Sequence, residues 1–366
     1  MKRYSIVALL ALIVSACGSA ASTPESPTQP PPTPTATEEP ALVPVSGPVL
    51  FEEPDFVFQG NDPSLPILTH EPSPAFQNQY INPGSVIFHD SQFHMFFNSF
   101  TAWPGTVLIG YARSEDGLDW EMVQDEPVFN SEQVPFGNGR ADVSSVLVVD
   151  DGTWVMYFPT VSNGNPPMEI GRATAASPLG PWSVDAEPVL TIGPEGSWDE
   201  QSLFWPNVVR DGKGYRMYYG ARNKQADFAI GMATSEDGIS WTKYDIPDTN
   251  DVLYAESDPV LLPSAEWEAN KVDRPRVQET PDGWVMIYQG GLAVENRGLA
   301  ISNDGIEWTT YPENPLFTKE TFPIPNAKTW DTSLLYHEGV YYYFMELGSL
   351  SGTDLYLTTH EGALRK

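Results

Sequence analysis

The sequence predicts an all-β protein, a five-bladed β-propeller with four-stranded blades whose last blade is completed by the N-terminal strand. The first observation behind this prediction is a repeat, in which each copy combines a strand, a tight turn and a second strand. The copies are IGYARSEDGLDW (109–120), IGRATAASPLGPW (170–182), IGMATSEDGISW (230–241) and LAISNDGIEW (299–308). Their shared alanines lie 61, 60 and 67 residues apart, at Ala112, Ala173, Ala233 and Ala300. A spacing this even indicates an array of similar units.

The second observation is the shape of the apolar runs. From residue 49 onward each run is short and bounded by Gly, Pro, Asn or Asp, and no stretch of helical period reaches three turns. Five units of strand, turn and aromatic-rich strand can be aligned, and the repeat adds two further strands to each of the first four units. The units begin at Ser85, Ser145, Asn207, Arg276 and Ser333.

The third observation concerns the ends of the propeller. The fifth unit has a third strand at 353–360 but no room for a fourth, while PVLFEEPDFVF (48–58) precedes the first unit. The apolar-then-acidic pattern of 48–58 resembles the fourth-strand sequences at 126–129 and 187–190. We therefore expect the N-terminal strand to complete the last blade, which makes 48–366 one domain.

The N-terminus has the pattern of a secretory signal. Lys2 and Arg3 precede an apolar run at 6–14, which is too short to span a bilayer, and small residues follow up to Cys17. The sequence VSAC resembles the lipobox of a bacterial lipoprotein. That resemblance implies a signal peptide at 1–16, cleavage before Cys17 and lipidation of this cysteine, with the protein secreted and lipid-anchored at the bacterial cell envelope, facing outside the cytoplasm. An ordinary signal with an incidental cysteine is the alternative.

Residues 17–47 are predicted to be a lipid anchor followed by a disordered tether. The segment from 18 to 47 is rich in Pro, Thr, Ser, Ala and Glu and has almost no large apolar residue. Its prolines favour an extended chain. Cys17 is the single cysteine of the sequence, so no disulfide can form within the chain.

The composition limits the kinds of molecule that the protein is expected to bind. Lys and Arg total 19 against 49 Asp and Glu, for a formal net charge of −30, which excludes nucleic acid as a partner and favours a neutral or cationic ligand. Aromatic residues make up 12% of the chain and include 11 Trp, whose flat faces suit sugar rings. Filling the interfaces between sheets is the alternative role of these aromatics. We expect a monomer that binds carbohydrate.

Loop lengths predict which face carries a site. The turns between first and second strands are short, whereas connections between blades and between second and third strands are long. In antiparallel blades both long classes lie on one face, where first strands begin and second strands end. The longest connections are 190–205 and 253–272. Long loops on a rigid scaffold are common binding sites, so we expect the site on that face.

Counting along the strands from this face gives two rings of residues around the axis. Polar residues are frequent in them, although solvated carboxylates or ligands of channel water are the alternative interpretation. The first ring is Asn82, Asp142, Trp205, Arg274 and Asp331. The second ring is Asn98, Pro159, Gly220, Gln289 and Glu346.

The repeated S-x-D-G-x-x-W turns and the charged residues at the axis resemble the glycoside hydrolase superfamily that includes families 43, 32, 62 and 130. In family 43, an Asp before Pro on blade one is the base, an Asp on blade two orients and tunes, and a Glu on blade three is the acid. The corresponding residues here are Asn82, Asp142 and Trp205, so only the second matches.

Other features resemble other families of the group. Asn82-Pro83 is similar to the opening of family 130 phosphorylases and hydrolases, which also bring arginines into the site. Arg274 and Arg276 could be such groups, or could form buried ion pairs with Asp273. The NDP sequence at 61–63 resembles a family 32 motif but lies outside the repeat register, so we interpret it as a turn.

Glycoside cleavage requires two carboxyl groups that flank the bond. The candidate acids and bases are Asp142, Asp331 and Glu346, with Asp273 and Glu200 in reserve, and crowding among them would raise the pKa of a proton donor. Register and resemblance agree on Asp142. Expected substrate-binding residues are Asn82, Asn98, Arg140, Trp205, Asp273, Arg274, Gln289 and Trp330. No histidine reaches either ring, so we expect neither a metal nor a cofactor.

Two classes of function remain open from the sequence. The first is a glycosidase that acts on oligosaccharides or polysaccharides outside the cytoplasm, with a mannoside phosphorylase as a variant. The second is a carbohydrate-binding lipoprotein that has kept the propeller without catalysis. Asn82 and Trp205 favour the second class, whereas Asp142, Asp331 and the crowded acids favour the first.

Overall fold

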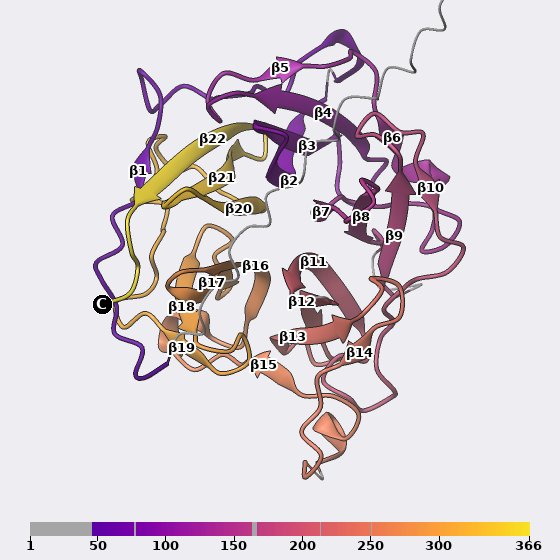
Figure 1. The fold of residues 1–366 in the computed structure, drawn as a ribbon, viewed down its shortest axis with the longest axis vertical. Helices are drawn as coiled ribbons and strands as arrows, with labels where there is room; N and C mark the ends of the chain where they lie inside the picture. Colours follow the sequence, from indigo (N-terminus) through magenta and orange to yellow (C-terminus); the bar gives the residue numbers. More distant parts are fainter. Residues whose placement is uncertain (1–45, 77, 163–166, 213, 250) are drawn as a thin grey trace, which may run out of the picture. The chain divides into compact units, whose positions relative to one another are not determined.

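Five antiparallel sheets arranged around a common axis form the part of the chain that the structure describes (Figure 1). This computed structural model describes residues 46–366 except 77, 163–166, 213 and 250. The five-bladed propeller predicted from the repeats is confirmed. Cys17, the signal at 1–16 and the tether up to residue 45 lie outside the described residues.

Blades one and two follow one another from the start of the propeller. Blade one is β2 (Tyr80–His89), β3 (Gln92–Phe100), β4 (Leu108–Ser114) and β5 (Glu121–Met122), with β6 (Phe129–Asn130) also paired to β4. Blade two is β7 (Ser145–Val148), β8 (Trp154–Pro159), β9 (Ile170–Ala175) and β10 (Ser183–Val184).

The remaining blades keep the same order of strands. Blade three is β11 (Ser202–Asp211), β12 (Gly214–Arg222), β13 (Phe228–Ser235) and β14 (Thr242–Lys243), with β15 (Pro259–Leu261) also on β13. Blade four is β16 (Val272–Thr280), β17 (Gly283–Gly290), β18 (Arg297–Ser302) and β19 (Trp308–Thr310). Blade five contains β20 (Thr332–His337), β21 (Val340–Ser349) and β22 (Gly352–Glu361). Short 3₁₀ turns are η1 (Pro74–Phe76), η2 (Ser131–Gln133), η3 (Val252–Tyr254) and η4 (Glu266–Glu268).

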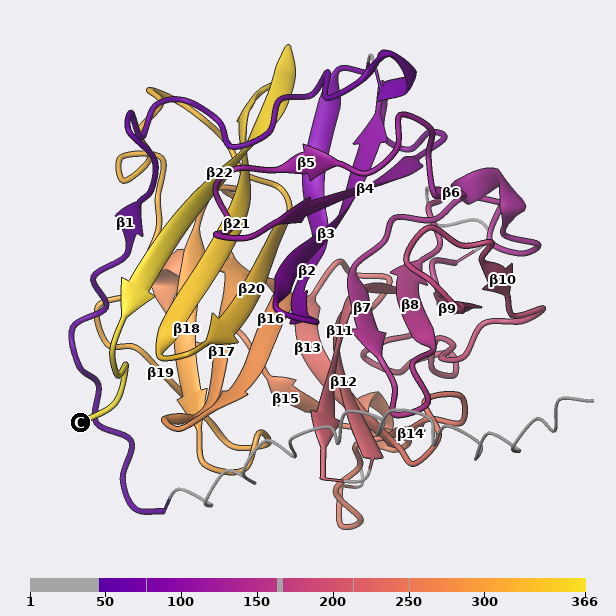
Figure 2. The same ribbon diagram turned by 45° about the horizontal axis from the view of Figure 1, so that its top comes forward.

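The N-terminal strand β1 (Val57–Phe58) completes blade five, as predicted. Val57 pairs with Thr359 and Phe58 with Thr358 on β22, and β1 lies beside β22 in both ribbon views (Figures 1 and 2). The strand is shorter than the 48–58 expected from the sequence, since the rest of that stretch makes only an isolated bridge between Phe51 and Arg365. The two ends of the propeller are thus held together by backbone hydrogen bonds.

The Ser-x-Asp-Gly turns are structural. In blade one, Asp116 Oδ1 accepts from the N–H groups of Leu118 and Asp119 at 2.8 and 2.9 Å, and Ser114 Oγ accepts from Gly117 N at 2.8 Å. The turns at Asp237 and Asp304 repeat this pattern. Because these carboxylates are satisfied by their own backbone, the turns need no ligand. Asp62 of the NDP sequence likewise accepts from Ser64 N at 3.0 Å, which confirms the turn expected there.

Each turn of this kind also contacts the neighbouring blade. The phenol of Tyr157 on blade two donates to Gly238 O in the turn of blade three at 2.7 Å. In the same way Tyr218 donates to Gly305 O of blade four at 2.9 Å. In blades three and four the repeated turn therefore fixes the blade against the one before it.

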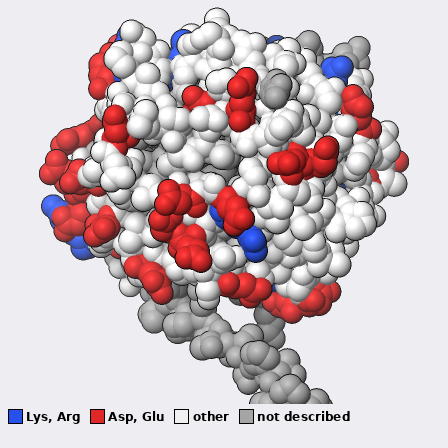
Figure 3. Space-filling model, turned by 90° about the horizontal axis from the view of Figure 1, so that it is seen from above, with Lys and Arg blue, Asp and Glu red and all other residues white. Residues whose placement is uncertain are grey.

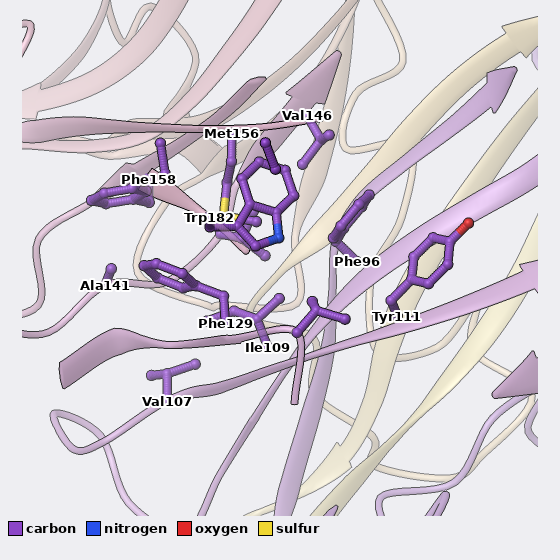
Figure 4. Close-up of a cluster of buried hydrophobic side chains, with 14 of the residues drawn as sticks. Phe96, Val107, Ile109, Tyr111, Phe129, Ala141, Val146, Met156, Phe158 and Trp182 are labelled. Atoms are coloured by element: carbon purple, nitrogen blue, oxygen red, sulfur yellow. The ribbon is translucent and has the colours of Figure 1, made fainter. Parts of the chain in front are cut away.

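Large apolar clusters fill the spaces between blades. Figure 4 shows one of them, in which Phe96 and Tyr111 of blade one pack with Met156, Phe158 and Trp182 of blade two. This packing is the main role of the buried aromatics. On the face seen in Figure 3, acidic side chains clearly outnumber basic ones, in line with the net charge of −30.

Around the axis, the first strands are joined by hydrogen bonds from one blade to the next, which we call the inter-blade ring. A short polar side chain on one first strand accepts from the N–H group of a valine on the first strand of the next blade. The pairs are Val86 N to Ser333 Oγ (3.0 Å), Val146 N to Ser85 Oγ (2.9 Å), Val208 N to Ser145 Oγ (3.0 Å) and Val277 N to Asn207 Oδ1 (2.6 Å). These bonds hold the innermost strands at fixed spacing.

Removing the hydroxyl of Tyr218 should measure how much one hydrogen bond between a turn and its neighbouring blade contributes to stability. Tyr218→Phe should lower the free energy of unfolding by about 1 to 2 kcal/mol, because Gly305 O loses its buried donor. The matched control is Tyr219→Phe on the same strand, since the phenol of Tyr219 is buried without a hydrogen-bond partner among the described residues. Urea unfolding compares the two. Equal losses would show that the bond to Gly305 contributes nothing specific.

Candidate active site

A cavity of about 380 Å³ lies at the axis, on the face where first strands begin and second strands end. This is the face on which the loop lengths place a site. Of the two longest connections, 190–205 and 253–272, Trp205 at the end of the first lines the cavity. The lining residues that the sequence singled out are Asn82, Asp142, Trp205, Arg274, Trp330, Asp331 and Glu346.

The two acids of blade five lie next to each other, Asp331 directly before β20 and Glu346 on the paired strand β21. Glu346 N donates to Asp331 O at 3.3 Å. Two backbone N–H groups hold the carboxyl of Glu346, since its Oε1 accepts from Trp330 N at 2.9 Å and from Asp331 N at 3.2 Å. These two hydrogen bonds hold Oε1 of the Glu346 carboxyl in place.

Burial and mutual repulsion raise the pKa of two of the three acids. Burial, and next the neighbouring Asp331, raise the pKa of Glu346 from 4.5 to about 8. Burial is also the main cause that raises the pKa of Asp142 well above its usual value, followed by the nearby Asp331 and Glu346. A neutral carboxyl can donate a proton or a hydrogen bond.

Asp331 has a different environment, because a buried arginine from the neighbouring blade contacts it. Arg276 Nη2 lies 2.5 Å from Asp331 Oδ1, and both side chains are almost fully buried. The same oxygen accepts from Thr332 N at 2.9 Å. Of the two alternatives for Arg276, the structure therefore has a buried ion pair, but its partner is Asp331 instead of Asp273.

Irregular strand pairing turns further side chains into the cavity. The register of the first strand shifts between Asn82 and Ser85, between Phe204 and Asn207, and between Asp273 and Arg276. At blades three and four the residues at the shift, Trp205 and Arg274, have φ of 40° and 48°, and a bulge of this kind re-aims a side chain.

The bulges also correct the first ring as counted from the sequence. The residues paired across the strands are Phe204 with Gly220 and Asp273 with Gln289, one position before the Trp205 and Arg274 that the count selected. The two bulged side chains nevertheless line the cavity and contact each other, with the guanidinium of Arg274 3.5 Å from the ring centre of Trp205.

The other residues expected to bind substrate lie beneath the cavity wall. Asn98 is fully buried and donates to Asn82 Oδ1 at 2.7 Å, while Arg274 Nη1 donates to Gln289 Oε1 at 2.6 Å. Asp273 Oδ2 is 3.6 Å from Arg274 Nη1. These side chains contact residues that line the cavity but do not line it themselves.

Two further candidates lie elsewhere. Arg140 is half-buried and does not line the cavity. Glu200, held in reserve as an acid, accepts from Gly196 N at 2.8 Å and pairs with Lys224 at 3.0 Å.

Sequence reasoning missed the aromatic wall of blade one. Tyr80 stacks on Phe100 with ring centres 5.4 Å apart, and Phe100 meets Trp103 edge-on at 5.9 Å. Trp103 remains 43% exposed, and all three rings line the cavity. Thr101, Ala102 and Leu350 complete the wall. The signal was the sequence FTAW at 100–103, which lies just beyond the ring positions that were counted.

Two acidic oxygens in this region are available to a ligand. Asp142 Oδ1 and Asp331 Oδ2 are buried and have no hydrogen-bond partner among the residues that the structure describes. Buried polar atoms are nearly always hydrogen-bonded, so these oxygens suit the hydroxyl groups of a bound molecule.

Within the described part of the chain, no group of three or more His, Cys, Asp or Glu side chains could hold a metal ion. No helix in residues 46–366, outside the undescribed gaps, has the length and apolar character needed to cross a membrane.

No protein-family model matches the chain. It is 26% identical over 117 residues to a β-1,2-mannobiose phosphorylase of Thermoanaerobacter sp., which covers 28% of this chain and 35% of that protein. It is 23% identical over 278 residues to a sucrose-6-phosphate hydrolase of Pediococcus pentosaceus, covering 63% and 53%. The chain thus spans about a third and about half of the lengths of these relatives.

Solved structures share the fold over most of their length. A structure described as a glycoside hydrolase has a TM-score of 0.61 at 18% identity and covers 83% of this chain and 93% of its own. A family 130 structure, from work on mannoside phosphorylases and hydrolases of β-1,2 mannosidic linkages, has a TM-score of 0.59 at 16% identity, covering 88% and 98%. A thermostable family 43 glycoside hydrolase gives 0.57 at 18% identity, covering 76% and 88%.

The chain therefore has the five-bladed propeller fold found in glycoside hydrolases of families 43 and 130. The resemblance stated from the repeats is confirmed at the level of fold. At sequence identities of 16 to 18%, the similarity to these structures shows a shared fold alone.

The raised pKa of Glu346 predicts a pH-dependent penalty on stability. Because the folded-state value of about 8 exceeds the ordinary 4.5, the stability that this neutral carboxyl contributes is complete below pH 4.5 and is lost progressively up to about pH 8. The loss is on the order of 1 kcal/mol per pH unit in that window.

Glu346→Gln keeps the acceptor oxygen and cannot ionise. It should therefore match the wild type in urea unfolding at pH 4 and be more stable at pH 8. The matched control is Glu132→Gln, since Glu132 is exposed. A wild type whose stability relative to Glu346→Gln does not change with pH would contradict the raised value.

Proposed function

We propose that the protein is a carbohydrate-active enzyme of the glycoside hydrolase type, which cleaves oligosaccharides or polysaccharides at the central cavity. The observation that carries this proposal is the pair of acids on blade five, in which Glu346 is neutral near pH 7 while the adjacent Asp331 is paired with Arg276. General acid and base catalysis of glycoside cleavage uses two carboxyl groups in these different states.

In the proposed reaction, Glu346 gives its proton to the glycosidic oxygen as the bond to the anomeric carbon breaks. Asp331 takes a proton from the water whose oxygen forms the new bond to that carbon. Asp142, whose pKa is also raised, would donate a hydrogen bond to a sugar hydroxyl when it is protonated. The products are two sugars with free hydroxyl groups; Asp331 then releases the proton it took to solvent and Glu346 takes one up, which restores both groups.

The walls of the cavity support a sugar as the ligand. Trp205 and Trp330 line one part, and Tyr80, Phe100 and Trp103 line another. Aromatic faces next to carboxyl and amide groups suit the apolar faces and the hydroxyls of a pyranose or furanose ring. In this proposal a bound sugar ring would cover Trp103, which is 43% exposed.

A second candidate is carbohydrate binding without catalysis. Asn82 favours it, because this position on blade one is where resemblance to family 43 would place a base. Its amide accepts from Asn98 and cannot remove a proton. The same cavity would then hold a glycan through its aromatic wall and polar groups.

Hydrolysis can be tested with arabinosides, xylosides, mannosides, galactosides and fructosides, as natural oligosaccharides and as nitrophenyl glycosides. The wild type should release reducing sugar, with kcat/KM falling as pH rises through about 8, because the acid must be protonated. Glu346→Gln should lose about 10² to 10⁴ of kcat/KM on natural substrates and less on nitrophenyl glycosides, whose leaving group needs little protonation.

The outcomes separate the alternatives. If Asp142→Asn removes the basic limb while Glu346→Gln keeps it, the acid is Asp142. A sugar phosphate that forms only when inorganic phosphate is added would indicate a phosphorylase. No turnover of any substrate, together with saturable binding of one glycan, would reject the enzyme and favour the carbohydrate-binding protein.

We also propose that the protein is secreted and anchored by a lipid on Cys17. The support is the sequence pattern of Lys2 and Arg3, the apolar run at 6–14 and the small residues before Cys17. A tether rich in proline would then separate the propeller from the membrane.

Lipidation should be visible in a bacterial host fed with radioactive palmitate. The wild-type protein should carry the label and sediment with membranes, and Cys17→Ser should do neither. Ser19→Ala serves as the control that leaves the cysteine in place. Wild-type protein that is unlabelled and stays in the soluble fraction would contradict the anchor.

A further inference from the structure

The inter-blade ring is interrupted at one blade, and the interruption lies at the candidate site. Ser85, Ser145, Asn207, Arg276 and Ser333 hold the same register on their first strands, opposite Phe96, Tyr157, Tyr218, Ile287 and Phe344. Four of these side chains accept a hydrogen bond from the next blade. Arg276 has only donors, so it cannot take this role.

Arg276 reverses the direction of the bond and adds an ionic contact. Its Nε donates to Thr332 O on blade five, and its Nη2 donates to Asp331 Oδ1 at 2.5 Å. The side chain is 2% exposed. A guanidinium in this position carries the large desolvation penalty of a buried charge, which a short polar residue, as in the other four blades, would avoid.

From this departure we infer that Arg276 is a positioning residue for the reaction, which orients Asp331 and holds it as the carboxylate that accepts a proton. The inference rests on the proposed function. Arg276 and Thr332 N both contact Oδ1, so Oδ2 is left for the water or hydroxyl that reacts.

The other charged groups around Asp331 do not replace this contact. Glu346 on β21 and Asp142 before β7 are acids that disfavour a further negative charge. Arg297 on β18 is fully buried and donates to the carbonyl oxygens of Thr329 and Trp330, both at 3.2 Å, so it fixes the backbone before Asp331. Of the described cations near Asp331, Arg276 is the one in ion-pair contact.

The test uses Arg276→Asn, which gives blade four the residue that blade three has at the same register. This variant can accept the inter-blade bond and should fold, but it cannot pair with Asp331. We expect kcat to fall at least 100-fold near neutral pH with KM within about threefold, and the acid limb of the kcat/KM profile to move up by more than one pH unit. Arg276→Lys, which keeps the charge, should recover part of the loss.

The matched control is Ser145→Ala, which removes one bond of the same ring without touching an acid. It should lower the melting temperature and leave the acid limb in place. A folded Arg276→Asn with the acid limb and kcat of the wild type would overturn the inference. So would a shift of equal size in Ser145→Ala, since that would mean that any break in the ring disturbs the site.

A second measurement needs no substrate and separates this inference from the proposed function. In thermal unfolding of Arg276→Asn, Asp331→Asn and the double variant, paired residues should give a combined loss of melting temperature much smaller than the sum of the single losses. Additive losses would overturn the pairing. If the pairing holds but no substrate is cleaved, the proposed hydrolysis fails, and with it the positioning role.

Discussion

The hydrogen bonds between first strands are the constraint on which the rest of the propeller depends. Blades one, two, three and five each contribute one short polar side chain that accepts from an N–H group of the next blade, as Ser85 does for Val146 and Ser145 for Val208. These bonds act at the narrowest part of the fold, where five strands converge. The Ser-x-Asp-Gly turns add a second set of contacts at larger radius, through phenols such as that of Tyr157. With the innermost strands fixed, side chains that enter the axis from different blades keep constant separations, which a site built from several blades requires.

The site arises where individual blades depart from the shared pattern. Blade four replaces the small acceptor with Arg276, and blades three and four each insert a bulge residue with positive φ, Trp205 and Arg274. Residues in left-handed conformations and buried charges both cost free energy, and they persist where the surrounding structure holds them. Here the ring and the apolar clusters supply that support. The repeats therefore provide stability, and the exceptions to them provide the chemistry of the cavity.

The repeats made the fold predictable, because strand period, turn sequence and unit spacing all indicate the same architecture. Closure by 48–58 followed from counting strands. Asp142, Asp331 and Glu346 could be placed at one cavity because, in blades two and five, the count from the second strand matches the register. The count was one residue off at Trp205 and Arg274, because a bulge adds a residue that apolar periodicity does not reveal. The ion pair of Arg276 with Asp331 could not be predicted, since it joins residues 55 positions apart through the closing geometry of two blades.

The electrostatics of the cavity explain why an asparagine at position 82 is compatible with catalysis. Asp142, Asp331 and Glu346 already share the cavity, and their mutual repulsion with burial raises the pKa of Asp142 and of Glu346. A fourth carboxyl at position 82 would repel these acids, and the partner at its own position is the neutral amide of Asn98. The cationic side chain, Arg276, belongs to blade four, which is the other neighbour of blade five, and it contacts Asp331. The guanidinium contact that can hold a base in place is therefore present at Asp331, whereas position 82 on blade one has a neutral amide as its partner. On the proposed mechanism, Asn82 is a neutral residue in the wall of a site whose acid and base both belong to blade five.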